Sequence, residues 1–154
     1  MKQIITLIMI GSIIMTSCEK QPDVAVISTK YGDMVLEFYP NIAKKHVDSF
    51  ITHTKNGYFD GTTFHRVIPG FVIQGGDPNS KDDDRSNDGM GGNAAKFYGE
   101  GEEENPDTWT LPAEFNDRLH ITGTLSMARS QAPNSAGSQF FICAGPTPQL
   151  DNKY

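Results

Sequence analysis

The stretch that decides the fold reads Phe64-His65-Arg66-Val67-Ile68-Pro69-Gly70-Phe71-Val72-Ile73-Gln74-Gly75-Gly76-Asp77. Two short apolar runs, 64–68 and 71–74, flank Pro69-Gly70, a pair typical of turns, so we predict two strands here. A lone arginine on a strand is usually an exposed charge or half of an ion pair. Arg66, beside Gln74 and several aromatic residues, also fits a small ligand site that has an apolar floor and few polar groups.

Further strands and one helix are predicted around this stretch. We expect strands at 24–29 and 34–38, joined by a turn at 30–33. Pro40 ends the second strand, and a helix should follow, with Asn41 as its N-terminal cap and Gly57 at its C-terminal end. The helix carries His46 and His53, which are seven residues apart and therefore poor joint metal ligands; a solvated or partly packed role is favoured for both.

Two more strands are expected at 121–128 and 138–142. In the second of these Phe140 and Phe141 are adjacent, and neighbouring strand residues point to opposite faces. One of the two should therefore face the core and the other the opposite side. Many short strands with glycine turns and one clear helix indicate a mainly β fold, a barrel or sandwich with helical additions.

The composition excludes several classes of function. The chain has 154 residues and a net charge of −6, which suits one domain and argues against nucleic-acid binding. Its two cysteines, Cys18 and Cys143, cannot build a disulfide scaffold or a thiolate zinc site alone. No Gly-rich phosphate loop, Ser-His-Asp order or paired carboxylates is present, so nucleotide chemistry and hydrolysis have little support. Cys143 follows an apolar strand and is predicted to be a buried small hydrophobe.

The first residues have the pattern of an export signal. Lys2 precedes an apolar run at 4–15 that is too short to span a bilayer, and small residues lead to Cys18. We predict a lipoprotein signal peptide at 1–17, lipidation of Cys18 and a polar tether over 18–23. An ordinary cleaved signal or a short anchor is the alternative. The domain itself should occupy 24–154.

The segment 75–107 is acidic, with ten acidic and three basic side chains, and is predicted to be one long surface loop insert. Its Asp84-x-Ser86-x-Asp88-Gly89 run is similar to the first half of a calcium loop. The twelfth position is Ala95, where a bidentate glutamate is needed. A solvated loop is therefore favoured over a calcium site.

Two blocks carry a resemblance that covers the chain from about Val24 to Tyr154. The first is the 64–77 stretch, preceded by Tyr58-Phe59-Asp60-Gly61-Thr62; the second runs from Gly123 through Arg129 and continues over 133–142. Together they resemble the cyclophilin family of peptidyl-prolyl cis/trans isomerases. The resemblance implies an antiparallel β-barrel capped by two helices. Family members continue past the residues that match 150–154, so we expect a C-terminally incomplete domain whose closing strands and second helix are missing.

The resemblance also implies roles for individual residues. Arg66 matches the catalytic arginine. The substrate groove is matched by His65, Phe71, Val72, Gln74, Ala128, Arg129, Gln139, Phe141, Leu150 and Tyr154. Of these, Phe71, Val72, Phe141 and Leu150 would form the proline pocket, while Gln74 and Gln139 would position Arg66 and the substrate backbone. Because Phe141 would face the pocket, we expect its neighbour Phe140 to face the core.

Four positions depart from the usual family pattern. Val72 replaces a methionine, Arg129 stands where asparagine is common, and Tyr154 stands where histidine is common. Gln149 occupies the place of a tryptophan that is typical of members with strong cyclosporin binding. The departures therefore bear more on drug binding than on isomerase activity.

The sequence thus predicts an isomerase of X–Pro bonds that needs no cofactor and no metal. We expect it to be a monomer at the bacterial cell envelope, lipid-anchored and extracytoplasmic, acting on proline-containing polypeptide clients. The first alternative is a catalytically weak module that binds proline peptides. The second, a metal-buffering protein, depends only on the acidic insert.

Overall fold

The computed structural model describes residues 24–154. The predicted signal peptide, the tether and Cys18 lie outside this range. Six strands and one α-helix follow in the order β1 (Val24–Thr29), β2 (Gly32–Glu37), α1 (Lys44–Lys55), β3 (Arg66–Ile68), β4 (Val72–Gly75), β5 (Leu125–Met127) and β6 (Phe140–Cys143). Short 3₁₀ turns lie at η1 (Pro78–Lys81), η2 (Arg85–Asn87), η3 (Pro106–Thr108) and η4 (Pro148–Leu150).

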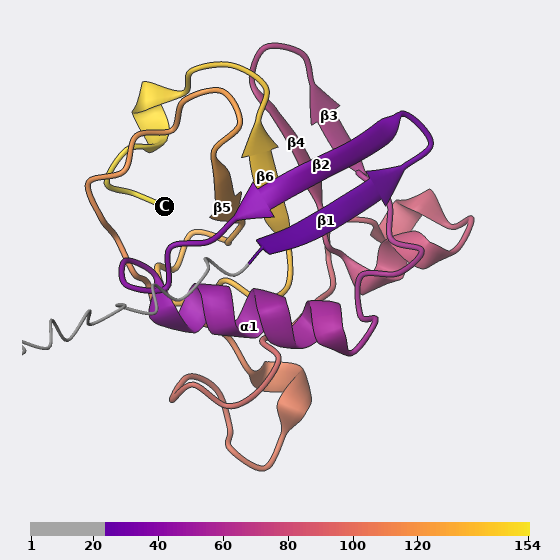
Figure 1. The fold of residues 1–154 in the computed structure, drawn as a ribbon. Coiled ribbons are helices and arrows are strands. Elements are labelled where there is room, and N and C mark those ends of the chain that lie inside the picture. Colours follow the sequence, from indigo (N-terminus) through magenta and orange to yellow (C-terminus); the bar gives the residue numbers. More distant parts are fainter. Residues whose placement is uncertain (1–23) are drawn as a thin grey trace, which may run out of the picture.

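The strands form two antiparallel sheets. β1 and β2 make a hairpin, and the other four strands form a sheet in the order β3-β4-β6-β5. Figure 1 shows the hairpin lying across this second sheet, with α1 running along one end of both. The prediction of a mainly β fold with short strands and one helix is confirmed.

The core lies between the hairpin, α1 and one face of the four-stranded sheet. Its buried residues include Leu36 and Phe38 at the end of β2, Phe50 of α1, and Phe140 and Ile142 of β6. The rings of Phe50 and Phe140 meet edge to face with centroids 5.2 Å apart. The prediction that Phe140 faces the core is therefore confirmed.

The helix begins later than predicted, and its cap comes from elsewhere in the chain. The N-terminal cap position is Ala43, not Asn41, and its side chain makes no capping bond. Instead the Glu114 carboxylate accepts the backbone N–H groups of Lys45 and His46, each at 3.0 Å from Oε2. A carboxylate is well suited to this place because the first N–H groups of a helix have no partner within it.

The C-terminal end of α1 follows the prediction. Gly57 comes directly after the cap residue Asn56 and has a φ of 67°, a left-handed conformation that glycine adopts without steric cost. The backbone N–H of Tyr58 donates to the carbonyl of His53 and that of Gly57 to the carbonyl of Thr54. These two bonds satisfy carbonyl groups that the helix itself leaves free.

Three further expectations need correction. β5 covers only Leu125–Met127, because residues 121–124 form a turn in which Thr124 N–H donates to the Ile121 carbonyl. His53 is more buried than a solvated or partly packed residue, at 5 % exposure, and its Nε2 lies 2.9 Å from the Asn93 carbonyl. The acidic insert is also not wholly a surface loop, because Asp77 and Ser80 within it are completely buried.

Candidate active site

The register of the four-stranded sheet puts the predicted catalytic arginine in a row with the predicted pocket. Arg66 of β3 is opposite Gln74 of β4, and Gln74 is in turn opposite Phe141 of β6. Directly paired residues of neighbouring strands point to the same face. Arg66, Gln74 and Phe141 therefore share the face opposite the core.

Side-chain hydrogen bonds continue this row as a chain of amides. Arg66 Nη1 donates to Gln74 Oε1 at 3.2 Å, and Gln74 Nε2 donates to Gln139 Oε1 at 2.9 Å. Gln139 Nε2 then donates to the Gly91 carbonyl at 2.7 Å. Each amide is oriented by the next, so the guanidinium is directed by a backbone carbonyl that lies three links away.

The far end of this chain is fixed by a buried carboxylate. Asp77 follows β4 and is completely buried, and its Oδ1 accepts the backbone N–H of Asn79 at 2.9 Å. Its Oδ2 accepts the backbone N–H groups of Gly89 and Gly91. Asp77 thus holds the backbone whose Gly91 carbonyl orients Gln139. No sequence pattern predicted a role for Asp77, although it is the last residue of the 64–77 stretch.

A small pocket of about 180 Å³ opens beside the guanidinium. The residues that line it are Arg66, Phe71, Val72, Gln74, Ala128, Arg129, Phe141, Leu150 and Tyr154. Val72 and Phe141 are buried and form one apolar cluster with Cys143, against which Phe71, Ala128, Leu150 and Tyr154 pack. Nine of the eleven residues predicted for the site therefore meet here.

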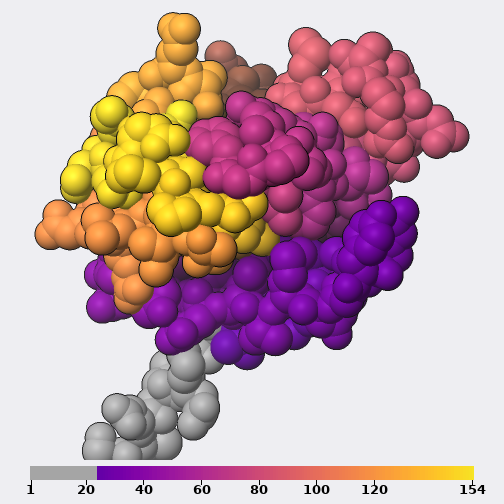
Figure 2. All heavy atoms as spheres, turned by 90° about the horizontal axis from the view of Figure 1, so that it is seen from above, coloured from indigo at the N-terminus to yellow at the C-terminus, as the bar shows by residue number. Residues whose placement is uncertain are grey.

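The pocket is assembled from segments that are far apart in the sequence. β3, β4 and β6 supply its floor, while Leu150 of η4 and Tyr154 come from the last residues of the chain. Figure 2 shows these last residues, in yellow, against the magenta segment that contains β3 and β4. The Tyr154 ring meets the Phe141 ring edge to face, with centroids 5.7 Å apart.

Two predicted groove residues do not line the pocket. Gln139 acts one step behind it, through its bond to Gln74. Neither ring nitrogen of His65 has a hydrogen-bond partner, and both are buried. A side chain built at Gly89 would lie 3.4 Å from the His65 ring, which places the ring against the loop 82–89.

Behind the pocket floor lies an acid–histidine pair, His120 and Asp151, that no sequence pattern predicted. The buried His120 ring stacks on Phe141 with centroids 5.9 Å apart, and its Nδ1 is 3.0 Å from Asp151 Oδ1. The backbone N–H of His120 donates to the same oxygen, and this bond is the main reason that the pKa of Asp151 is lowered. The residues are thirty-one positions apart, so no local pattern indicated the pair.

The nine residues that line the pocket include no Ser, Thr, Cys, Lys, His, Asp or Glu. Cys143 is buried, as predicted, and burial raises the pKa of its thiol above the ordinary value. A thiol in this state is a poor nucleophile. Within 24–154, no three His, Cys, Asp or Glu side chains are grouped so as to hold a metal ion. Asp84 of the calcium-like run accepts instead from the backbone and hydroxyl of Ser86.

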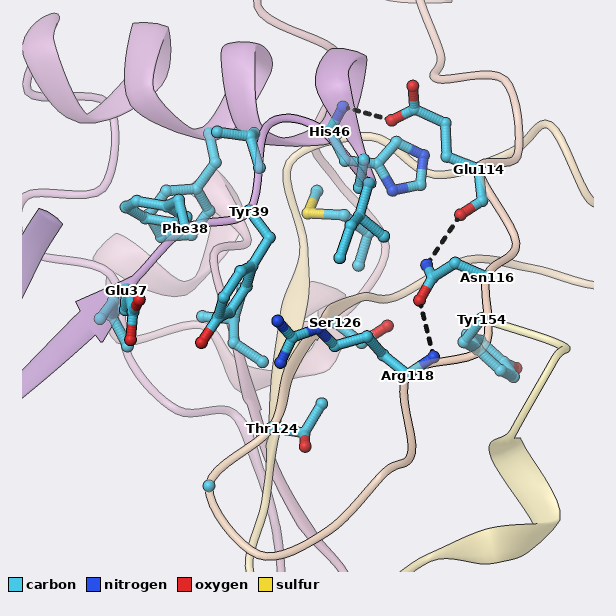
Figure 3. A pocket seen from close by; sticks show the side chains of 18 of the residues that line it. Glu37, Phe38, Tyr39, His46, Glu114, Asn116, Arg118, Thr124, Ser126 and Tyr154 are labelled. Carbon is cyan, nitrogen blue, oxygen red and sulfur yellow. Dashed lines mark hydrogen bonds between the residues drawn. The ribbon is translucent and has the colours of Figure 1, made fainter. Parts of the chain in front are cut away.

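A second, larger cavity of about 540 Å³ lies on the other face of the sheet, between α1, the end of β2 and the segment 114–127. Figure 3 shows hydrogen bonds between side chains and backbone groups among the residues that line it, at His46, Glu114, Asn116 and Arg118. Glu114 caps α1, Asn116 Oδ1 accepts the Arg118 N–H at 3.0 Å, and the Arg118 guanidinium lies 3.5 Å from the centre of the Tyr39 ring.

No helix within 24–154 has both the length and the apolar character needed to cross a bilayer. The helix α1 has twelve residues and carries charged side chains.

Comparison with known proteins identifies the family to which this chain is similar. The model of the cyclophilin type peptidyl-prolyl cis-trans isomerase family matches residues 24–154. A peptidyl-prolyl cis-trans isomerase of Synechococcus elongatus is 41% identical over 127 residues, which are 82% of this chain and 72% of that protein. A Staphylococcus aureus protein, provisionally named as a peptidyl-prolyl cis-trans isomerase, is 50% identical over 117 residues, or 76% of this chain. The chain spans about half the length of that relative.

Solved structures of the same family are similar to this chain in fold. A Cryptosporidium parvum cyclophilin type peptidyl-prolyl cis-trans isomerase, crystallised in the presence of the dipeptide Ala-Pro, superposes with a TM-score of 0.69 and 34% identity. The match covers 84% of this chain and 73% of that one. The sheet register, the Arg66 pocket, the family model and these relatives all lead to one assignment: the chain belongs to the cyclophilin family of peptidyl-prolyl cis-trans isomerases.

Proposed function

We propose that this chain accelerates cis–trans rotation about X–Pro peptide bonds, with Arg66 as the catalytic residue and the 180 Å³ pocket as the proline site. One observation carries the proposal. An arginine directed by an ordered chain of amides stands beside an apolar pocket whose lining residues include no Ser, Thr, Cys, Lys, His, Asp or Glu.

Amide physics explains why such a site is sufficient. Rotation about a peptide bond is opposed by a barrier of about 18–20 kcal/mol, which comes from resonance between the nitrogen lone pair and the carbonyl. Uncatalysed X–Pro exchange therefore takes tens of seconds or longer. No covalent bond breaks during rotation, so the catalyst needs neither a nucleophile nor a metal.

The guanidinium can lower this barrier by donating toward the prolyl nitrogen. In the planar amide the nitrogen lone pair is delocalised and accepts poorly; in the twisted state it is localised and accepts well. A donor at this point therefore stabilises the twisted state more than either planar state, which is the condition for catalysis. Arg66 suits this role because arginine stays charged and presents a rigid planar fork of donors.

The pocket supplies the second requirement, a fixed proline ring. Phe71, Val72, Phe141 and Leu150 provide an apolar surface of suitable size. If the ring is held while the acyl side remains free to turn, the rotation is confined to a single bond. These contacts act on planar and twisted proline alike, so they determine affinity rather than rate.

The predicted location completes the proposal. Lipidation of Cys18 would add two acyl chains, enough for stable membrane anchoring, and would place the domain beside extracytoplasmic polypeptides as clients. In a Cys18→Ala variant we expect the protein to leave the membrane fraction or to remain unprocessed. Membrane partition and mature mass identical to those of the parent would contradict the anchor.

The activity is tested by exchange NMR on an Ala–Pro peptide, because this method observes both isomers and needs no coupling protease. We expect exchange broadening or exchange cross-peaks at substoichiometric amounts of the full chain. Saturable binding of the peptide without faster exchange would contradict the proposal and would indicate a module that only binds proline segments.

A further inference from the structure

Two arginines, and no acidic side chain, line the proposed proline groove. Arg66 enters it from β3, and Arg129 enters from the residues that follow β5. None of the nine lining residues is Asp or Glu. Among residues 24–154, neither arginine forms an ion pair, whereas Arg85 pairs with Asp88 and Lys96 with Asp48. The groove therefore holds two uncompensated cations in a chain whose net charge is −6.

Neutral groups hold Arg129 in place. Its Nη1 donates to the carbonyls of Ser130 and Gln131 at 2.9 and 3.2 Å, and its Nη2 donates to the Lys153 carbonyl at 2.7 Å. Its guanidinium carbon lies 4.4 Å from the centre of the Tyr154 ring. Carbonyl groups and an aromatic face fix the position of a guanidinium without cancelling its charge.

This arrangement lowers the cost of binding an anion. A surface ion pair is usually weak because two long side chains must be immobilised to form it. Arg129 is already immobilised in the free protein. Binding a peptide carboxylate therefore costs little additional side-chain entropy at this arginine. Arg66 adds a second positive charge in the same groove, so an acidic side chain is attracted and a basic one is repelled.

The acidic insert 75–107 contacts the site at the end of the amide chain and not at Arg129. It contacts the amide chain through the Gly91 carbonyl, which accepts from Gln139. No hydrogen bond within 24–154 joins Arg129 to that insert. The attraction is therefore expected mainly at the Arg129 end of the groove.

We propose that Arg129 makes the groove selective for client segments that carry Asp or Glu close to the proline. This specificity rests on the proposed isomerase function and names its substrate class. The expected gain is about two- to fivefold in kcat/KM for an acidic over a neutral peptide, the range of one exposed ion pair. A basic peptide should fall below the neutral one by a similar factor.

The test uses three peptides that share one Ala–Pro bond and differ at a single position, with Glu, Gln or Lys placed two residues before the proline. A second set places the same residues two positions after it. Exchange NMR gives kcat/KM, and chemical-shift titration gives Kd, for the full chain at low salt and in 0.5 M NaCl, where charge screening is strong. We expect the order Glu, Gln, Lys in at least one set, and a smaller spread in high salt.

Three variants separate charge from structure. Arg129→Gln should lower the Glu-to-Lys ratio to the part that Arg66 alone supplies, while Arg129→Lys, which keeps the charge but loses the planar fork, should retain more of it. Arg118→Gln is the matched control, because it removes the same charge from the rim of the other cavity; the ratio should stay at the parental value.

Equal values of Kd and kcat/KM for the three peptides, or a Glu-to-Lys ratio that stays at the parental value in Arg129→Gln, would overturn the inference. The titration separates this inference from the isomerase proposal. Selective binding of Glu peptides without faster exchange would support the specificity and contradict the activity. Fast exchange without selectivity would support the isomerase activity and contradict the specificity.

Discussion

Gln74 is directly opposite Arg66 in the β3–β4 register, and its Oε1 accepts a hydrogen bond from Arg66 Nη1 at 3.2 Å. The same amide donates to Gln139, so its oxygen is the end that faces the arginine. Arg66 is exposed to solvent, and without this partner its long side chain would sample many rotamers. The directed guanidinium is thus a product of sheet pairing and not of arginine alone.

The first prediction concerns this pairing. Gln74→Leu removes both the acceptor for Arg66 and the donor to Gln139 while keeping a similar volume. We expect kcat to fall by about tenfold, which corresponds to the loss of one hydrogen bond to a charged group, whereas the peptide Kd changes less. Exchange NMR measures the rate and shift titration the affinity. A variant with parental kcat would show that Arg66 needs no orientation by Gln74.

The second prediction concerns the buried anchor of the amide chain. The Asp77 carboxylate accepts three backbone N–H groups. In Asp77→Asn an N–H₂ group replaces one of its two oxygens, so at least one partly buried donor loses its partner. We expect the free energy of unfolding to fall by about 1–3 kcal/mol, measured from the urea midpoint. Asp83→Asn is the control, because Asp83 is exposed in the same insert and should change stability by less than about 0.5 kcal/mol. Equal midpoints for the two variants would contradict the anchoring role.

The third prediction concerns the remote cap of α1. Glu114→Ala removes the carboxylate that accepts the N–H groups of Lys45 and His46. We expect a loss of about 0.5–2 kcal/mol in stability, the usual cost of losing an N-terminal cap. Hydrogen exchange should show faster exchange of the first amides of α1 than of its last turn. Glu104→Ala, at an exposed position, serves as the comparison; a loss of the same size there would argue against capping.

The fourth prediction concerns pH. Burial lowers the pKa of His46 and His53 below the ordinary value of 6.5. The unfolded chain then binds protons that the folded chain does not, so stability is fully present above about pH 6.5 and falls as the pH drops below it. Each histidine contributes at most about 1.4 kcal/mol per pH unit. Urea midpoints between pH 8 and 5 should show the decline, and His53→Gln should flatten it. An unchanged slope in that variant would exclude His53 as a source.

Much of the fold was predictable because local chemistry fixes it. The turn at Pro69-Gly70, the glycine after α1 and the alternation of Phe140 and Phe141 each depend on neighbouring residues. Their structural consequences were confirmed. Nine of the residues predicted for the site line one pocket, but their selection came from the resemblance to a family and not from any local pattern.

The rest depends on contacts between distant parts of the chain. Asn41 has the right chemistry for a cap, yet Glu114, about seventy residues later, takes the role because the fold brings its carboxylate to the helix end. Asp77 was counted among the acids of a surface loop, although its burial follows from three backbone N–H groups that converge on it. Burial of this kind is a property of the assembled loop, and charge patterning alone does not reveal it.

The central claim is that Arg66 acts on the twisted amide while the pocket grips the proline ring. It is tested most directly by measuring kcat and peptide Kd for Arg66→Ala and Phe141→Ala in parallel, by exchange NMR and shift titration on the same Ala–Pro peptide. We predict that Arg66→Ala loses most of kcat with a much smaller change in Kd, that Arg66→Lys restores little, and that Phe141→Ala mainly weakens binding. Near-parental kcat in a correctly folded Arg66→Ala variant would contradict the mechanism.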